Sequence, residues 1–279
     1  MIAMTQTNPT SNKILPSSMA QIGITTKYTL LDYLRSKRYL AIFIITFFIS
    51  VLLTIVIAYE RPANIIGKPL DFYGGWWNGV VILIVLSGIL FGGDAISNEF
   101  QSKTGYFTVP NPVRRSSVYI GKFIAAYAAA SSIIAIFAVI GLGNGLVYLG
   151  FNVPVQFVES LLFSLFYLAA ILGFSFFFSA LFKSSAMSII INAIFVLFVF
   201  SLIQGLVTGL VKIEPWFILT YAQTIIINIF TTPFPAHAVT AGGMTMYTAT
   251  VSEGLAIIGL YFAVTTVLGL LLFERKEFN

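Results

Sequence analysis

The stretch 39-YLAIFIITFFISVLLTIVIAY-59 decides the class of fold to which this chain belongs. It is apolar on every face of a helix and carries no charged side chain. A helix of this length can cross about 30 Å of hydrocarbon, and it satisfies all of its backbone hydrogen bonds within the segment, as lipid requires. The stretch therefore predicts a helix that crosses a membrane.

Five more segments have the same character and length. The composition agrees, because 58% of the residues are hydrophobic and only 9% are charged, against roughly 25% charged residues in soluble domains. We therefore predict an all-α integral membrane protein with six transmembrane helices. The further spans are expected at residues 76–93, 123–149, 157–182, 186–211 and 253–273.

Lysine and arginine residues are distributed unevenly between the two sides that these spans define. Of the 15 basic residues, twelve fall on the side of the N-terminus, and only Arg61, Lys68 and Lys212 fall on the other side. Loops on the cytosolic side of membrane proteins carry such an excess. We therefore expect a multi-pass protein of the plasma membrane with both termini in the cytosol.

Two segments outside the spans also predict structure. Residues 1–38 should form a polar cytosolic tail followed by a helix over 24–38 that mixes apolar and basic side chains and lies at the membrane interface. Residues 216–230 are apolar but short, and a seventh crossing there would carry Arg275 and Lys276 outside. We interpret them as short outer or re-entrant helices between the fifth and sixth spans, within a transmembrane domain over 39–279.

Details within the spans support three narrower predictions. The third span exceeds the hydrocarbon thickness, so it must tilt, protrude or break, and the glycine-rich residues 141–145 are the expected place for a break. Tyr73, Trp76 and Trp77 are typical of an outer interfacial belt. Asn192 and Gln204 should form hydrogen bonds between helices, with a place in a substrate path as the alternative.

The sequence offers few groups for catalysis or for metal binding. It has no cysteine, and its single histidine, His237, has no carboxylate within ten residues, so we expect it to be solvated. No acidic residue lies near the middle of a span, which disfavours an ion-driven carrier. Because no paired catalytic residues occur, an intramembrane enzyme is disfavoured too. We expect no catalytic or metal site. The positive-inside bias explains the net charge of +5, so we expect no nucleic-acid partner either.

A polar stretch over residues 94–122 interrupts the apolar sequence between the second and third spans. Ser97, Glu99 and Phe100 are typical of the start of a short amphipathic helix, which Gly105 can end. Prolines at 110 and 112 then turn the chain, and two arginines open the return into the membrane. A short helix held between two spans can be pushed by a soluble partner, and it would move both spans together.

This arrangement resembles the membrane subunit of ABC-2 type transporters. In that family the corresponding loop carries an acidic residue, a Gly/Thr pair, a proline turn, one or two arginines and a Gly-Lys pair. The order Thr104-Gly105 is reversed relative to many members, and Gln101 stands where a second acidic residue often occurs. The matching positions are Glu99, Thr104, Gly105, Pro112, Arg114 or Arg115, Gly121 and Lys122.

The resemblance implies a permease that works with a second permease, identical or homologous, and with two ATP-binding-cassette subunits. Coupling to the ATPase would then involve Glu99, Phe100, Lys103, Gly105, Arg114 and Arg115. Phe100 would be an apolar plug in a groove of the partner, and the two arginines would contact acidic groups or lipid phosphates.

Energy for transport would have to come from another polypeptide. The sequence contains no phosphate-binding loop, since Lys122 is followed by Phe123 and Ser116 stands where the first glycine should be. ATP and Mg²⁺ are therefore expected on the partner, with no cofactor on this chain. The resemblance favours export, and spans without midplane charge favour a hydrophobic or amphipathic cargo such as a lipid, peptide or drug. A non-transporting membrane anchor or sensor subunit is the alternative function.

Overall fold

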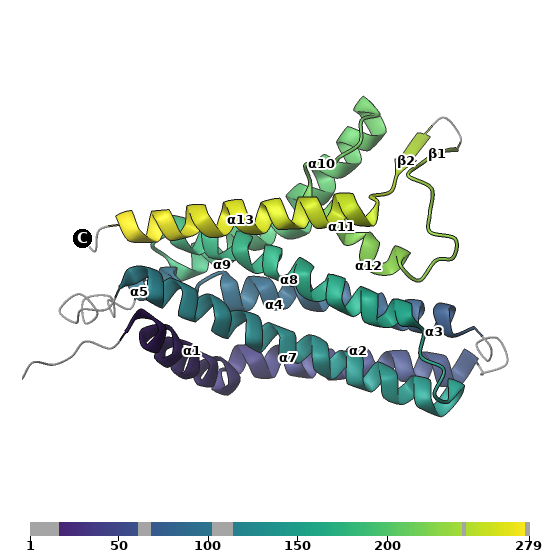
Figure 1. The fold of residues 1–279 in the computed structure, drawn as a ribbon, viewed down its shortest axis with the longest axis horizontal. Coiled ribbons are helices and arrows are strands. Elements are labelled where there is room, and N and C mark those ends of the chain that lie inside the picture. Colours follow the sequence, from purple (N-terminus) through teal and green to yellow (C-terminus); the bar gives the residue numbers. More distant parts are fainter. Residues whose placement is uncertain (1–16, 61–67, 102–113, 242–243, 277–279) are drawn as a thin grey trace, which may run out of the picture.

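The computed structural model describes residues 17–60, 68–101, 114–241 and 244–276. Within these ranges six helices are long and apolar enough to cross a membrane, which confirms the predicted all-α membrane fold. They run side by side as one bundle (Figure 1). The six spans are Lys37–Tyr59, Pro69–Gln101, Arg115–Leu149, Val155–Leu181, Ser185–Val211 and Val251–Arg275.

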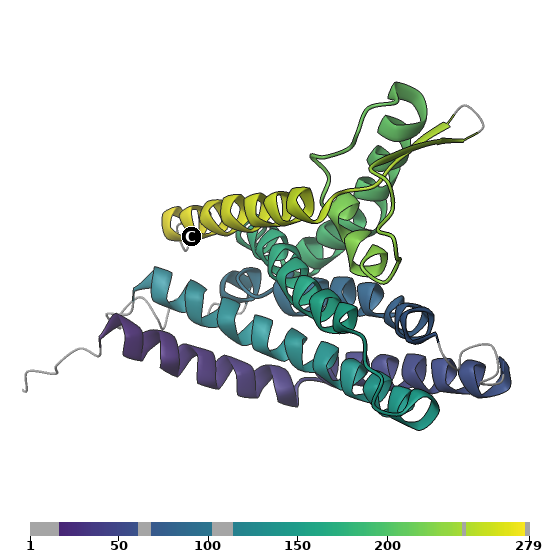
Figure 2. The ribbon, with the colours of Figure 1, turned by 45° about the vertical axis from the view of Figure 1, so that its right-hand side comes forward.

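The first two helices follow one another along a single long helix. Both α1 (Ser18–Arg35) and α2 (Lys37–Glu60) lie beside α7 (Arg115–Leu149), α1 along its first part and α2 along its second (Figures 1 and 2). Gly121 permits the close approach of α1, because a Cβ atom there would lie 3.1 Å from the carbonyl oxygen of Ile22. The predicted helix therefore exists with different bounds, and its place at a membrane interface stays a prediction.

The second span consists of three helical pieces, α3 (Pro69–Trp77), α4 (Val80–Gly92) and α5 (Ser97–Gln101). Helix α3 begins at Pro69, before the predicted start of the span, and its aromatic residues lie inside the bundle. The Trp76 ring stacks on Phe137 at 5.5 Å between centroids, and Trp77 Nε1 donates to Ser164 Oγ at 3.3 Å. The prediction of an outer aromatic belt is wrong, since Tyr73, Trp76 and Trp77 are buried.

The third span, α7, is one continuous helix and does not break at its glycines. Gly141 faces the indole of Trp76 and Gly145 faces the hydroxyl of Tyr73, each so closely that a Cβ atom would overlap the aromatic side chain. These glycines therefore make room for α3. The excess length of α7, roughly 50 Å at 1.5 Å per residue, extends beside α1 instead.

The fourth and fifth spans supply the remaining contacts around α4. The fourth is α8 (Val155–Leu181), and the fifth alternates α-helix with short π-helical pieces. Asn192 Nδ2 donates to Ser175 Oγ of α8 at 2.8 Å, and Gln204 Oε1 accepts from Thr220 Oγ1 at 2.7 Å. Both amides therefore join separate segments. The pieces of the fifth span are α9 (Ser185–Ile194), η2 (Phe195–Val199), α10 (Phe200–Leu206) and η3 (Val207–Val211).

Short elements connect the fifth span to the sixth, α13 (Val251–Arg275). Two of them, α11 (Leu219–Gln223) and α12 (Ile225–Asn228), replace a seventh crossing, as predicted. An antiparallel hairpin that the sequence analysis did not predict pairs Ala238 with Tyr247. Its strands are β1 (Ala238–Ala241) and β2 (Met244–Tyr247).

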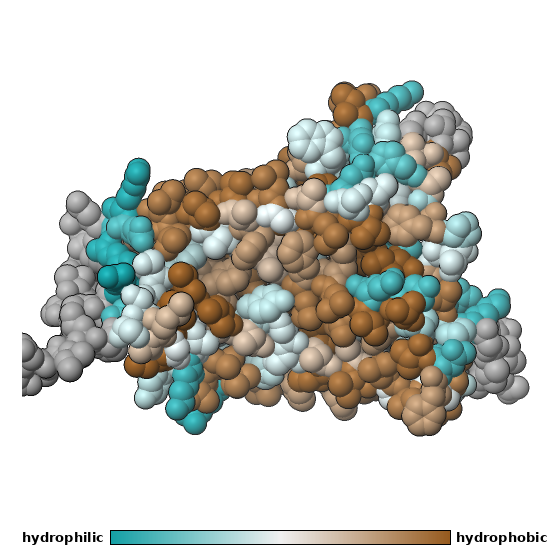
Figure 3. All heavy atoms as spheres, viewed as in Figure 1, coloured by the Kyte–Doolittle hydropathy of each residue, from teal (hydrophilic) through white to brown (hydrophobic). Residues whose placement is uncertain are grey.

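The bundle has two distinct ends (Figure 1). We call the end at which α1 begins and α13 finishes the termini end, and the opposite end, which carries β1 and β2, the hairpin end. Hydrophilic residues gather toward both ends of the visible face, and hydrophobic residues cover the middle (Figure 3). This distribution suits a protein whose middle lies in hydrocarbon.

Candidate functional site

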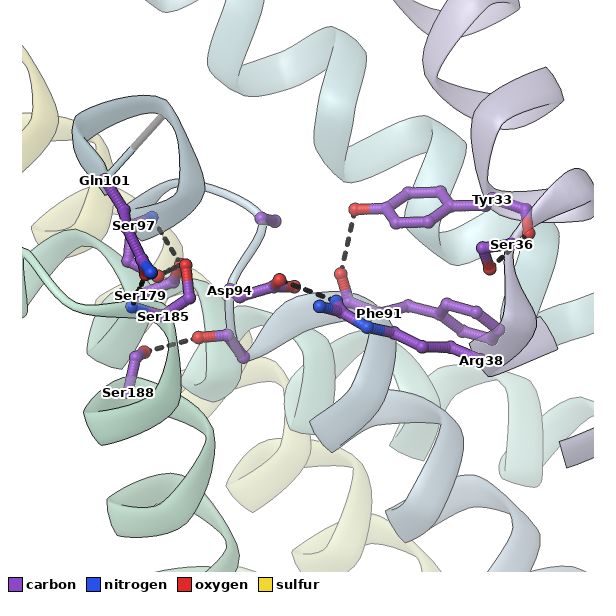
Figure 4. Close-up of polar contacts among 12 residues, drawn as sticks. Tyr33, Ser36, Arg38, Phe91, Asp94, Ser97, Gln101, Ser179, Ser185 and Ser188 are labelled. Atoms are coloured by element: carbon purple, nitrogen blue, oxygen red, sulfur yellow. Dashed lines mark hydrogen bonds and ion pairs between the residues drawn. The ribbon is translucent and has the colours of Figure 1, made fainter. Parts of the chain in front are cut away.

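The candidate site is built around α5 at the termini end, where the second span leaves the bundle core. The hydroxyl oxygen of Ser179, on α8, accepts hydrogen bonds from the backbone amides of Ile96 at 2.8 Å and Ser97 at 3.0 Å (Figure 4). Amides at the start of a helix lack partners within the helix. Ser179 therefore caps α5 from a different span.

The fifth span holds the same segment from another side. Ser188 Oγ donates to the carbonyl oxygen of Gly93, just before α5, and Gln101 Oε1 accepts from the backbone amide of Ser185 at 2.8 Å (Figure 4). Both contacts involve the first turn of α9. The α5 segment is thus linked to the fifth span at both of its ends.

An ion pair joins α5 to the third span. Lys122 Nζ, in the second turn of α7, contacts Glu99 Oε1 and also donates to the carbonyl oxygen of Ala95 at 2.9 Å. The two charged side chains are only 13% and 19% exposed. Glu99 and Lys122, both part of the sequence motif, therefore form one contact within the chain.

Phe100 packs inside its own chain, against the end of the sixth span. Its ring lies 6.1 Å from the ring of Phe273, edge to face, and Lys276 Nζ lies 4.4 Å from its centroid. The Lys276 ammonium also donates to the last carbonyls of α8, at 2.8 Å to Ala180 and 3.0 Å to Phe182. Burial, with a smaller effect of nearby Lys183, lowers the pKa of Lys276 to about 8.

The first helices complete the surroundings of the site. Arg38 forms an ion pair with Asp94 at 2.6 Å, and Tyr33 Oη donates to the carbonyl oxygen of Phe91 at 2.9 Å (Figure 4). Between these helices and α5 lies a polar cleft of about 700 Å³. Its lining includes Asp32, Lys37, Arg38, Asp94, Asn98 and Glu99.

The two arginines of the motif occupy different environments. Arg114 is exposed and immediately precedes α7, whereas Arg115 Nη1 donates to the carbonyl oxygens of Glu274 and Lys276, each at 2.9 Å. Arg115 therefore binds the end of α13, where a cation also complements the helix dipole. The predicted contacts of both arginines with a partner or lipid stay predictions. Lys103 and Gly105 lie outside the described residues.

The surroundings of His237, at the hairpin end, differ from the prediction of a solvated side chain. His237 does not stand alone in solvent, because Nε2 lies 3.3 Å from Glu214 and Nδ1 lies 3.6 Å from Glu253. The two carboxylates come from positions 23 residues before and 16 residues after the histidine. A search for nearby carboxylates in the sequence could not find them, since the fold of the outer segment brings them together.

A family model described as ABC-2 family transporter protein matches residues 27–278, nearly the whole chain. The chain belongs to the ABC-2 transporter family. No curated protein matches it. Membership makes this ABC-2 chain a multi-pass membrane protein and the permease subunit of an ABC transporter, a component that associates with an ATP-binding-cassette partner.

Several residues that hold α5 in this ABC-2 permease were not linked to it from the sequence. Ser179 and Lys276 lie far from α5 in the chain and belong to no motif. Lys122 was part of the family resemblance, but the sequence did not identify Glu99 as its partner. Two opposite charges separated by 23 residues are a weak signal of an ion pair, because the intervening residues can fold in many ways.

Proposed function

We propose that this permease is one half of an ATP-driven exporter, that its termini end faces the cytosol, and that α5 receives the movement of a separate ATP-binding-cassette subunit. The observation that carries the proposal is the attachment of α5 to four other spans. Its contacts reach α7 through Lys122, α8 through Ser179, α9 through Ser185, and α13 through Phe273.

These attachments favour transmission of force over simple anchoring. A helix of five residues is far too short to be stable alone, so its position depends on the side chains that hold it. Displacing α5 must therefore strain or shift the spans that supply those side chains. A membrane anchor would need only an exposed binding surface, without such connections.

The distribution of charge supports the orientation. The termini end carries the described basic residues Arg38, Arg114, Arg115, Lys122 and Lys276, and an excess of such residues favours the cytosolic side. The exposed Asn98 and Gln101 of α5 and the polar cleft beside it offer a surface to a soluble partner. Phe100 faces its own chain, so its proposed part is to pass movement of α5 to α13, in addition to any contact with the partner.

The proposed cargo is hydrophobic or amphipathic, as the uncharged middles of the spans suggest. Most of the apolar surface of α2, of the fifth span and of α13 is not covered within the chain. Lipid or a second permease can cover these faces. The proposed exporter therefore contains two permeases, identical or homologous, with the cargo path between them.

A cross-linking experiment tests docking and orientation together. The natural chain has no cysteine, so Asn98→Cys and the control Phe151→Cys each introduce a single thiol. Phe151 lies at the hairpin end and is 96% exposed. We expect that, of the two variants, only Asn98→Cys cross-links to the ATP-binding-cassette subunit. Only Phe151→Cys should react with an impermeant maleimide in intact cells. The reverse labelling pattern would contradict the proposed orientation.

A second experiment separates the exporter from the anchor. The complex is reconstituted in liposomes, and ATP hydrolysis and movement of a fluorescent lipid or a hydrophobic dye are measured together. We expect the double variant Glu99→Gln, Phe100→Ala to assemble and hydrolyse ATP with little transport, whereas Glu159→Gln at the hairpin end behaves as wild type. Assembly of the wild-type complex without ATP-dependent movement of any probe would favour the anchor.

A further inference from the structure

Three side chains that are distant in sequence converge at the hairpin end. Glu214 follows the fifth span, His237 immediately precedes β1, and Glu253 lies in the first turn of α13. One oxygen or nitrogen atom from each side chain lies within 4.8 Å of the other two. All three side chains are partly exposed, so an ion from the surrounding solution can reach them.

The imidazole is oriented by a hydrogen bond. His237 Nδ1 lies 3.0 Å from the carbonyl oxygen of Thr248. A carbonyl can only accept, so Nδ1 carries the hydrogen and Nε2 is the nitrogen left to bind a ligand. Nε2 is also the atom that lies 3.3 Å from Glu214 Oε2. Histidines that bind metals commonly donate their other ring N–H to a carbonyl in this way.

Both carboxylates are oriented as well. Glu214 Oε1 accepts from Tyr221 Oη at 2.9 Å, and Glu253 Oε2 accepts from the backbone amide of Thr250 at 2.8 Å. The protein therefore orients both carboxylates. Glu214 Oε2 faces Nε2, and Glu253 Oε2, which lies 3.6 Å from Nδ1, keeps a second lone pair for a ligand.

The charge of the cluster favours a cation. Within the part of the chain that the structure describes, neither Glu214 nor Glu253 forms an ion pair with a lysine or arginine. Two carboxylates lie beside the imidazole ring, and the dipole at the start of α13 favours the charge of Glu253. A protonated imidazole would neutralise only one of the two carboxylates, whereas a divalent ion neutralises both.

Two of the three side chains already have the spacing of ligands to a first-row transition metal. In a tetrahedral zinc site with bonds of about 2.0–2.1 Å, two ligand atoms lie about 3.3 Å apart. The separation between Nε2 and Glu214 Oε2 has this value. One imidazole and two carboxylates, with water in the remaining position, form a donor set that zinc accepts.

We propose that Glu214, His237 and Glu253 bind one divalent transition-metal ion of the zinc class at the hairpin end. The ion would join the outer segment to the first turn of α13. This site is independent of the ATPase coupling proposed above, because binding can be measured on the permease alone.

Zinc binding to the purified, detergent-solubilised chain tests the proposal directly. The chain has one histidine and no cysteine, so with an affinity tag that lacks histidine, His237 is the only imidazole. Competition with a fluorescent zinc chelator should give one site per chain. We expect His237→Gln to weaken binding at least tenfold, Tyr221→Phe to weaken it about tenfold by releasing Glu214, and Glu159→Gln to leave it unchanged.

Spectroscopy gives a second readout that does not depend on affinity alone. Cu²⁺ bound at the site should show an electron-paramagnetic-resonance signal with coupling to one imidazole nitrogen, and this coupling should disappear in His237→Gln. Equal zinc binding by wild type and His237→Gln would overturn the proposal. So would a wild-type chain that binds no zinc.

Discussion

Lys122 of α7 and Glu99 of α5 form a largely buried ion pair across 23 residues of sequence. The pair connects the return of the chain into the bundle with the short helix that precedes it. Lys122 also binds the carbonyl oxygen of Ala95, so one ammonium group holds both α5 and the turn that leads into it. Coupling between α5 and the third span therefore depends on a charged contact that can be removed from either side.

The ion pair predicts non-additive effects of mutation. Glu99→Gln or Lys122→Met should each lower the thermal stability of the detergent-solubilised chain, because each leaves a buried charge without its partner. The double variant should lose less unfolding free energy than the two single variants together, with a coupling energy of about 1–3 kcal/mol. A double-mutant cycle of unfolding free energies measures it, and strictly additive losses would show that the two groups do not interact.

Lys276 predicts a dependence of stability on pH. Its pKa is lowered to about 8 by burial, whereas in the unfolded chain it should be about 10.4. Between these values the unfolded state binds more protons, so this group makes stability rise with increasing pH. Melting temperatures from pH 7 to 10 should therefore rise more steeply, or fall less steeply, in wild type than in Lys276→Gln.

Lys183 supplies the control for that experiment. It lowers the pKa of Lys276 by charge repulsion, as the smaller of the two causes. Lys183→Gln should therefore raise the pKa of Lys276 and shift the start of the rise to higher pH. Parallel profiles of melting temperature against pH in wild type, Lys276→Gln and Lys183→Gln would contradict the lowered pKa of Lys276.

The glycines of α7 predict a contrast between neighbouring positions. Gly145→Ala would place a methyl group against the Tyr73 hydroxyl and should cost about 1–3 kcal/mol of stability through overpacking. Gly143 lies two residues away on the same helix, and a Cβ atom added there would meet no other atom within 4 Å. Gly143→Ala should therefore leave stability unchanged or slightly raised. Equal melting temperatures for the two variants would show that α3 does not pack on Gly145.

The spans were predictable from sequence because hydrophobicity and length alone specify a membrane helix. The positions of their aromatic residues were not. Trp76 near the end of an apolar segment looks the same whether it faces lipid headgroups or a neighbouring helix, and only the glycines of α7 decide that it is buried. The prediction of a break at 141–145 was wrong for the same reason, since a glycine that permits a bend also permits close packing.

The candidate site was predictable only where its residues lie close in sequence. Glu99 and Lys122 belong to one polar stretch, residues 94–122, and the family resemblance drew attention to both. Ser179, Lys276 and the partners of His237 are brought in by other helices, and no local pattern marks them. Contacts of this kind depend on how the bundle packs, which propensity and hydropathy do not specify.

Substitutions of the two adjacent arginines should have different effects on the end of α13, a difference that the sequence alone does not show. Arg115 donates to the carbonyl oxygens of Glu274 and Lys276 at the end of α13, whereas Arg114 is exposed. Arg115→Met should therefore release the last turn of α13 and speed hydrogen exchange of its amides, together with loss of the Lys276 contact to Phe100. Arg114→Met should leave exchange there unchanged, since its side chain does not hold that helix end. Exchange in peptides covering residues 268–276, followed by mass spectrometry, compares the variants, and equal protection in both would show that Arg115 does not fasten the sixth span.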